Sequence, residues 1–161
     1  MKKLEITEQI INELQESVNE TFYAVLAEKM VVASKTRMDK LESISEITSQ
    51  VSLFQENLEA ILIICLDKQT LLYIANKVFG SNKTEIDDAV KSCINEFSNM
   101  IFGVLKTKLT KYGYKFKMSI PSLITGTHEF SANIKNGETY QIKFLLTVPE
   151  RVVTVNLCLT N

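Results

Sequence analysis

The stretch from Thr84 to Tyr112 has the periodicity of one long amphipathic α-helix. At about 100° per residue, its hydrophobic side chains gather on one face, which we predict to be buried. That face consists of Ile86, Ala89, Val90, Cys93, Ile94, Phe97, Ile101, Val104, Leu105 and Tyr112. The rest of the chain is therefore expected to be organised around this helix.

The opposite side of the predicted helix is polar. It carries Ser92, Asn95, Glu96, Asn99, Gly103 and Lys106. Glu96, Asn99 and Gly103 are spaced i, i+3 and i+7, so they lie one above another along the helix axis. A glycine inside a helix costs about 1 kcal/mol relative to alanine, and solvent exposure alone does not require one. We therefore expect a partner to approach closely at Gly103.

Charged residues at both ends of the stretch suit a helix. Asp87 and Asp88 fall in the expected first turn, where the helix dipole favours carboxylates. The opposite pole is complemented by Lys106, Lys108 and Lys111. We interpret these residues as helix stabilisation, and the two aspartates not as metal ligands.

The remaining pattern predicts two more helices and a sheet. Thr7 to Met30 has a hydrophobic stripe behind a capping threonine and is expected to pack on the sheet, and Lys68 to Phe79 is a short helix that ends at Gly80. Val31 to Ser45 is left open between an extended stretch and a loop. The predicted fold class is α+β, with a mostly antiparallel sheet packed with about three helices, one of them carrying Glu96 and Asn99.

The predicted strands follow from runs of alternating or continuous hydrophobic residues. They are Glu46 to Gln55, Glu59 to Asp67, Lys115 to Ile124, the alternating runs on either side of the hairpin signal Asn136-Gly137, and Val153 to Leu159. The second is almost wholly apolar and so is expected at the centre of the sheet. Pro121 requires an edge or a bulge, because it cannot donate a ladder hydrogen bond.

Length and charge limit the class of protein. The chain has 161 residues and a formal net charge of -1, which suits a single domain over residues 1–161. Its lysines and arginines are scattered, so we expect neither a nucleic acid nor a membrane as partner. The longest apolar run, Ala60 to Leu66, is far shorter than the roughly 20 residues of a membrane span, which predicts a soluble protein.

The three cysteines point to a reducing compartment. Cys65, Cys93 and Cys158 each lie inside an apolar run, and none belongs to a C-x-x-C pair. We expect buried, reduced thiols and, since Glu5 and Glu8 interrupt any signal-peptide core, a cytoplasmic protein.

Familiar catalytic and cofactor motifs are not found in the sequence. The five glycines are isolated, so no loop is suited to phosphate binding. The single histidine, His128, falls in an expected turn from Thr125 to Glu129, where we interpret it as solvated. We therefore expect no metal or other cofactor on this chain.

One motif stands out against this background. The run Glu96-Phe97-Ser98-Asn99-Met100-Ile101-Phe102-Gly103 resembles the Glu-x-x-Asn-Met-x-x-Gly signature of the CheX/CheC family, chemotaxis phosphatases that act on the phosphorylated response regulator CheY. Asp87-Asp88-Ala89 is similar to the start of that family's helix, and Ser119-Ile120-Pro121-Ser122 with Gly126 to the strand after it. A single copy of the signature is typical of the CheX branch. Phe102 departs from the pattern, because the family often has a small residue there, and it would alter how that flank meets the partner.

The resemblance implies a role for each polar residue of the motif. Asn99 would fix a water molecule for attack on the aspartyl phosphate, and Glu96 would form a salt bridge with the receiver's active-site lysine. Ser92, Asn95 and Lys106 would border the contact. The receiver domain would supply Mg²⁺, and the phosphatase would be a homodimer, for which the long C-terminal strand is a candidate sheet edge.

Elementary chemistry is compatible with these roles. An aspartyl phosphate is already reactive, so a phosphatase needs only to place a water molecule, and a neutral amide such as Asn99 accepts and donates hydrogen bonds at once. Glu96 as a general base is less favoured than Glu96 as an ion-pair partner, because a phosphoryl dianion would repel it.

Two alternatives stay open. The first is a non-catalytic receiver-binding or flagellar-switch adaptor of the same fold, and the intact Glu96 and Asn99 favour the enzyme over it. The second is a structural oligomerisation domain, which would leave Gly103 unexplained.

Overall fold

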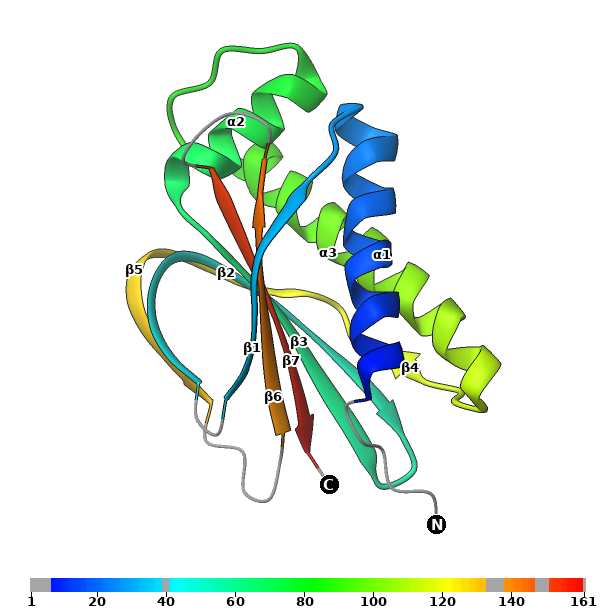
Figure 1. Ribbon diagram of the computed structural model, residues 1–161. Helices are drawn as coiled ribbons and strands as arrows, with labels where there is room; N and C mark the ends of the chain where they lie inside the picture. The colour runs from blue at the N-terminus through cyan, green and yellow to red at the C-terminus, as the bar shows by residue number, and fades with distance from the viewer. Residues whose placement is uncertain (1–6, 39–40, 133–137, 147–150, 161) are drawn as a thin grey trace.

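In the described part of the chain, seven antiparallel strands form one sheet, and the helices pack on one of its faces (Figure 1). The computed structural model describes residues 7–38, 41–132, 138–146 and 151–160. The helical elements in these ranges are α1 (Glu8–Leu26), α2 (Lys68–Phe79), α3 (Asp88–Leu109) and a 3₁₀ turn η1 (Thr110–Tyr112). The strands are β1 (Val31–Met38), β2 (Leu41–Gln55), β3 (Leu58–Leu66), β4 (Lys117–Met118), β5 (Ser122–Ala132), β6 (Glu138–Leu145) and β7 (Val152–Thr160). The predicted α+β class with an antiparallel sheet is confirmed.

The strand order is β1-β6-β7-β3-β2-β4, and β5 also pairs with β2. The apolar strand β3 lies between β7 and β2, so its predicted central position is confirmed. The C-terminal strand β7 hydrogen-bonds to β6 on one side and to β3 on the other, so the expectation that it supplies a sheet edge is wrong. The described edge strands are β1 on one side and β4 and β5 on the other.

For the segment Val31 to Ser45, the sequence did not decide between an extended stretch and a loop. It is strand on both sides of residues 39 and 40, which the structure does not describe. Most side chains of β1 are exposed, so its sequence carries no alternation to indicate a strand. The first part of β2 extends beyond β3 and pairs with β5, and the two curve away together as an arch (Figure 1). A bulge between Ser45 and Ile47 marks the bend, and Gly126 on β5 takes a positive φ of 88° there.

The predicted strand from Lys115 to Ile124 is divided. β4 ends at Met118 and β5 begins at Ser122, because Pro121 between them has no N–H for a ladder hydrogen bond. His128 lies within β5 and not in a solvated turn, which corrects that interpretation. The side chain of His128 is half-buried, with Nε2 at 2.8 Å from Thr48 Oγ1. The predicted hairpin at Asn136-Gly137 lies outside the described residues.

Helix α3 begins later than its hydrophobic pattern indicates. Asp87 is the N-cap, and its Oδ1 accepts a hydrogen bond of 3.0 Å from the backbone N–H of Val90. A hydrogen bond from Lys83, with that backbone bond, holds the pKa of Asp87 below its ordinary value. The helix therefore starts at Asp88 and not at Thr84, because a side-chain cap ends the preceding loop at a fixed residue.

The buried face of α3 is broader than predicted. Ala89 in the first turn is exposed, contrary to expectation, while Ser98, Phe102 and Leu109 are buried. Phe102 is fully buried, so its departure from the family pattern lies in the core and not on the flank that would meet a partner. The face is broad because α3 packs against α1 on one side and against β2 on the other.

The antiparallel contact between α1 and α3 has an apolar half and a polar half. The rings of Phe22 and Phe97 pack with centroids 5.1 Å apart. Toward the other end, Lys108 Nζ lies 2.8 Å from Glu20 and 3.1 Å from Glu16. Burial opposes the charge of Lys108, but the hydrogen bonds with Glu20 and Glu16 raise its pKa above the ordinary value. Lys108 thus links α3 to α1 through these ion pairs, in addition to complementing the dipole of α3.

The contact between α3 and β2 includes a buried polar pair. Ser98 and Ser49 are both fully buried, and their Oγ atoms are joined by a hydrogen bond of 2.6 Å. Because Ser98 immediately precedes Asn99, this bond fixes the rotation of α3 about its axis at the position from which the Asn99 side chain projects.

We expect the Ser98–Ser49 pair to show strong non-additivity. Ser98→Ala leaves the Ser49 hydroxyl buried without its partner, which should lower the free energy of unfolding by about 1–3 kcal/mol. The double substitution Ser49→Ala with Ser98→Ala removes both hydroxyls and should recover most of that loss. Urea unfolding of both single variants and the double variant measures this coupling. Additive losses would show that the two hydroxyls do not depend on each other.

Candidate functional site

Helix α3 brings the sequence-predicted site residues together on one side. Glu96 and Ser92 are exposed, and Asn99 and Gly103 are half-buried. In the part of the chain that the structure describes, neither the Glu96 side chain nor the Asn99 side chain has a hydrogen-bond or ion-pair partner. The carboxylate and the amide are therefore available to another molecule, one turn of a rigid helix apart.

None of the described residues requires a glycine at position 103. A Cβ built there meets no atom within 4 Å, and the backbone is ordinary helix. The position of the missing side chain at Gly103 is thus accessible from solvent, next to Asn99 and Glu96. Without a side chain there, the backbone of another protein could lie directly against the helix.

The two remaining predicted contact residues are less accessible. Asn95 and Lys106 are half-buried. The Asn95 Oδ1 atom is shielded from solvent and accepts no hydrogen bond from any described residue. Ser92 therefore offers more of its side chain to a partner than Asn95 does.

An apolar groove that was not predicted from the sequence lies beside Glu96. We call it the α2–α3 groove; its volume is about 350 Å³, and it is lined by Val25, Val78, Phe79, Ser92, Cys93, Glu96, Phe97 and Met100. Burial raises the pKa of the Cys93 thiol to about 11, so this part of the lining is uncharged at neutral pH. The apolar pair Val78-Phe79 directly before the helix-ending Gly80 was the signal that could have indicated the groove.

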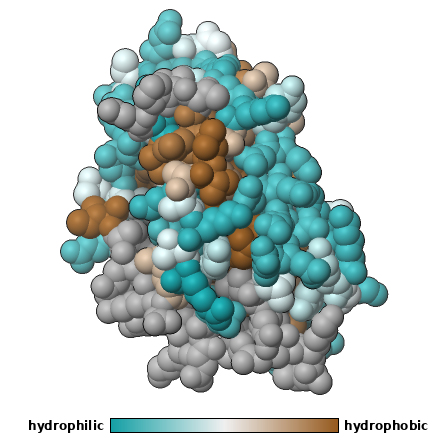
Figure 2. Space-filling model, in the orientation of Figure 1, coloured by the Kyte–Doolittle hydropathy of each residue, from teal (hydrophilic) through white to brown (hydrophobic). Residues whose placement is uncertain are grey.

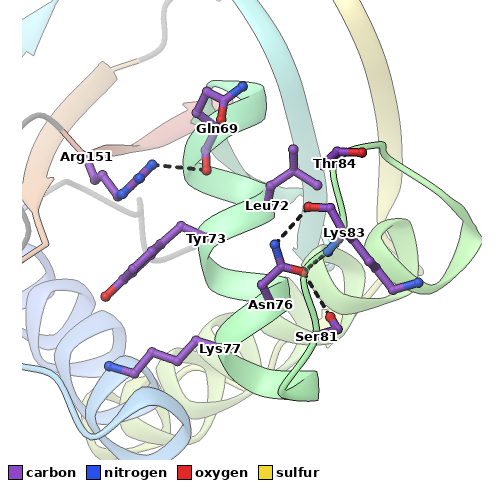
Figure 3. A pocket seen from close by; sticks show the side chains of 9 residues that line it. All are labelled: Gln69, Leu72, Tyr73, Asn76, Lys77, Ser81, Lys83, Thr84 and Arg151. Carbon is purple, nitrogen blue, oxygen red and sulfur yellow. Dashed lines mark hydrogen bonds between the residues drawn. The ribbon is translucent and has the colours of Figure 1, made fainter.

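A second hollow, of about 510 Å³, lies along α2 and holds none of the motif residues. Figure 3 shows Tyr73 and Lys77 on one side of α2 and Asn76 on the other. The cations here are engaged: Lys77 pairs with Glu28, and the Arg151 guanidinium lies 4.7 Å from the centre of the Tyr73 ring. Asn76 holds the following loop through two hydrogen bonds to the backbone of Lys83. We interpret this hollow as structural.

Four further features concern metal binding, membrane spans, surface hydropathy and cysteines. Among the described residues, no three His, Cys, Asp or Glu side chains are grouped so that they could hold a metal ion. None of the described helices has the length and hydrophobicity needed to cross a membrane. Among the coloured residues in Figure 2, hydrophilic ones predominate, and a hydrophobic patch lies in the upper half of the view. All three cysteines are free, with Cys65 half-buried and the other two buried.

Solved structures with the same architecture define the class. A CheC-like superfamily protein from Shewanella sp. PV-4 has a TM-score of 0.87 at 19% identity, covering 97% of this chain and 100% of that one. CheX from Desulfovibrio desulfuricans has a TM-score of 0.82 at 17% identity, covering 94% and 99%. The CheX–CheY–BeF3–Mg²⁺ complex from Borrelia burgdorferi has a TM-score of 0.72 at 23% identity, covering 94% and 98%. The protein is thus an α+β domain of the CheC-like fold.

The family follows from the sequence itself. A family model described as "Chemotaxis phosphatase CheX" matches residues 47–145, which is more than half of the chain. This protein belongs to the CheX family, and the predicted resemblance is confirmed. A comparison with curated protein sequences gave no match.

Proposed function

We propose that this protein hydrolyses the aspartyl phosphate of a CheY-like response regulator and so ends a chemotaxis signal. The observation that carries the proposal is the outward-facing pair Glu96 and Asn99, which have no partner among the described residues and stand beside the open Gly103. Membership of the CheX family supports it. The CheX protein of Borrelia burgdorferi, which shares this fold, forms a complex with CheY, which supports a CheY-like partner here.

In this proposal Asn99 positions the attacking water. The receiver holds the acyl phosphate together with its own Mg²⁺ and lysine, so the phosphatase supplies geometry and no nucleophile. The amide oxygen of Asn99 accepts a hydrogen bond from water while its NH₂ group donates to a phosphoryl oxygen. Because Asn99 projects from a packed helix, its backbone has little conformational freedom left to lose when the side chain enters the receiver's site.

Glu96 pairs with the receiver's active-site lysine in the same complex. Glu96 is exposed in the free protein and loses water only when the receiver covers it, so the ion pair forms in a less polar setting than bulk solvent. Ser92 and Lys106 border this contact. The ion pair orients the two proteins so that Asn99 meets the phosphoryl group.

The family also suggests a cytoplasmic homodimer, which we include in the proposal. Because β7 is internal to the sheet, a dimer formed by strand pairing would use β1 or the β4 and β5 edge. A receiver-binding adaptor with no activity is the competing function, and phosphate release separates the two.

Asn99→Ala should abolish most of the catalysis and leave binding intact. Loss of the water-positioning amide should reduce the catalysed rate of phosphate release about 100-fold, toward the receiver's own rate. The measurement is release of phosphate from a phosphorylated CheY-like receiver, with binding followed separately by titration. Asn82→Ala, at an exposed loop position, is the matched control. Near-native turnover by Asn99→Ala would contradict the water-positioning role.

Glu96→Gln should act mainly on complex formation. Removal of the charge leaves the receiver lysine without its partner, so the affinity for the phosphorylated receiver should fall about 30-fold. Titration of the receiver at two salt concentrations measures both the affinity and its salt dependence, which should decrease in the variant. Glu129→Gln, an exposed glutamate on β5, is the control. Equal affinities for Glu96→Gln and the wild type would remove the ion pair from the proposal.

Gly103→Ala should change stability and activity in opposite directions. Alanine has the higher helix propensity and its Cβ would crowd none of the described side chains, so the free energy of unfolding should rise by about 1 kcal/mol. The same methyl group stands where we expect the receiver to approach, so affinity for the receiver should fall. Urea unfolding and receiver titration on one preparation measure both effects. A more stable variant with unchanged affinity would show that no close approach occurs at this position.

A further inference from the structure

The α2–α3 groove leaves large hydrophobic side chains uncovered at one place. Phe79 is 47% exposed, Val78 39% and Met100 36%. All three line the groove, where Phe97 and the uncharged Cys93 form part of its floor. Isolated exposed hydrophobic residues are common, but a cluster of them around a hollow is typical of an interaction surface.

The ends of two helices leave this surface open. Helix α1 ends at Leu26, where Ala27 takes a left-handed conformation, and α2 ends before Gly80, which does the same. Val78 and Phe79 therefore lie in the last turn of α2, and the chain turns away directly after them. Figure 1 shows these ends of α1 and α2 near each other at the top of the molecule.

The groove is continuous with the motif on α3. Cys93, Phe97 and Met100 lie at i, i+4 and i+7 along α3, on the flank next to Ser92 and Glu96. Among the described residues that line the groove, Glu96 alone is charged. A molecule that contacts the Glu96 carboxylate is therefore in position to cover the groove as well.

We propose that the α2–α3 groove binds a hydrophobic side chain of the receiver domain, next to the receiver lysine that pairs with Glu96. This inference rests on the proposed function. The hydrophobic contact excludes water from one flank of the Glu96–lysine pair, which strengthens the pair and gives the phosphatase a means of selecting among receivers by the side chain beside their lysine.

Charge argues against two other occupants. In a symmetric contact between two copies of this chain centred on the groove, the two Glu96 carboxylates would face each other and repel. An anionic lipid surface would be repelled by the same group. A partner that combines a cation with a hydrophobic side chain fits both features of the surface.

The test compares Phe79→Ser with Phe54→Ser, since Phe54 is 42% exposed on β2 and lines no part of the groove. We expect Phe79→Ser to raise KM for the phosphorylated receiver about tenfold and to leave kcat unchanged, because the contact is made equally before and during the reaction. Phe79→Leu, which keeps a hydrophobic side chain, should restore most of the affinity, and Phe54→Ser should match the wild type. Val78→Thr keeps the shape of the side chain and should raise KM in the same direction.

The outcomes separate this inference from the proposed function. If the wild type accelerates phosphate release but Phe79→Ser and Val78→Thr both have the wild-type KM, the groove proposal is overturned and the phosphatase assignment stands. If the wild type does not accelerate release from any receiver, the proposed function fails and the groove proposal with it. A smaller apparent mass of Phe79→Ser on gel filtration, with unchanged KM, would assign the groove to a second copy of the chain and overturn the proposal.

Discussion

The rotation of α3 about its own axis is the constraint on which the site depends. Successive residues of a helix point about 100° apart, so the direction of the Ser98 side chain fixes the direction of the Asn99 side chain. The buried hydrogen bond between Ser98 and Ser49 assigns Ser98 to the sheet. The Phe22–Phe97 contact and the Lys108 cluster hold the same rotation from the α1 side. Asn99 and Glu96 face outward because these contacts face inward.

This arrangement suits a reaction whose reactive groups belong to the partner. A site that only positions a water molecule and an ion pair requires accurately placed side chains more than a deep cavity. A helix packed on two sides places its side chains accurately. The open surface around Glu96 and Asn99 is then the expected form of such a site. It is also why the larger hollow along α2, whose cations are already engaged within the chain, is the less informative one.

Several features of this face oppose the stability of the isolated chain. Gly103 lowers the helix propensity of α3, and Phe79, Val78 and Met100 expose hydrophobic area to water. All of them lie along the same helix or at the groove beside it. Features that weaken an isolated fold, gathered on one surface, are best explained by contacts that form only when a second protein covers that surface.

The sequence by itself determined the elements whose pattern is local. The polar stripe of α3, the end of α2 at Gly80 and the continuous apolar run of β3 follow from neighbouring residues, so helix, strand and central position were predicted from them. Tertiary structure alone decided which distant segments meet. β1 has exposed faces and no alternation, His128 is part of a strand only because β2 extends to pair with β5, and β7 is internal because β6 and β3 flank it. The burial of Phe102 and the groove at Phe79 have the same origin, since both depend on how α1, α2 and β2 pack around α3. The hydrophobic periodicity of a single segment cannot predict that packing.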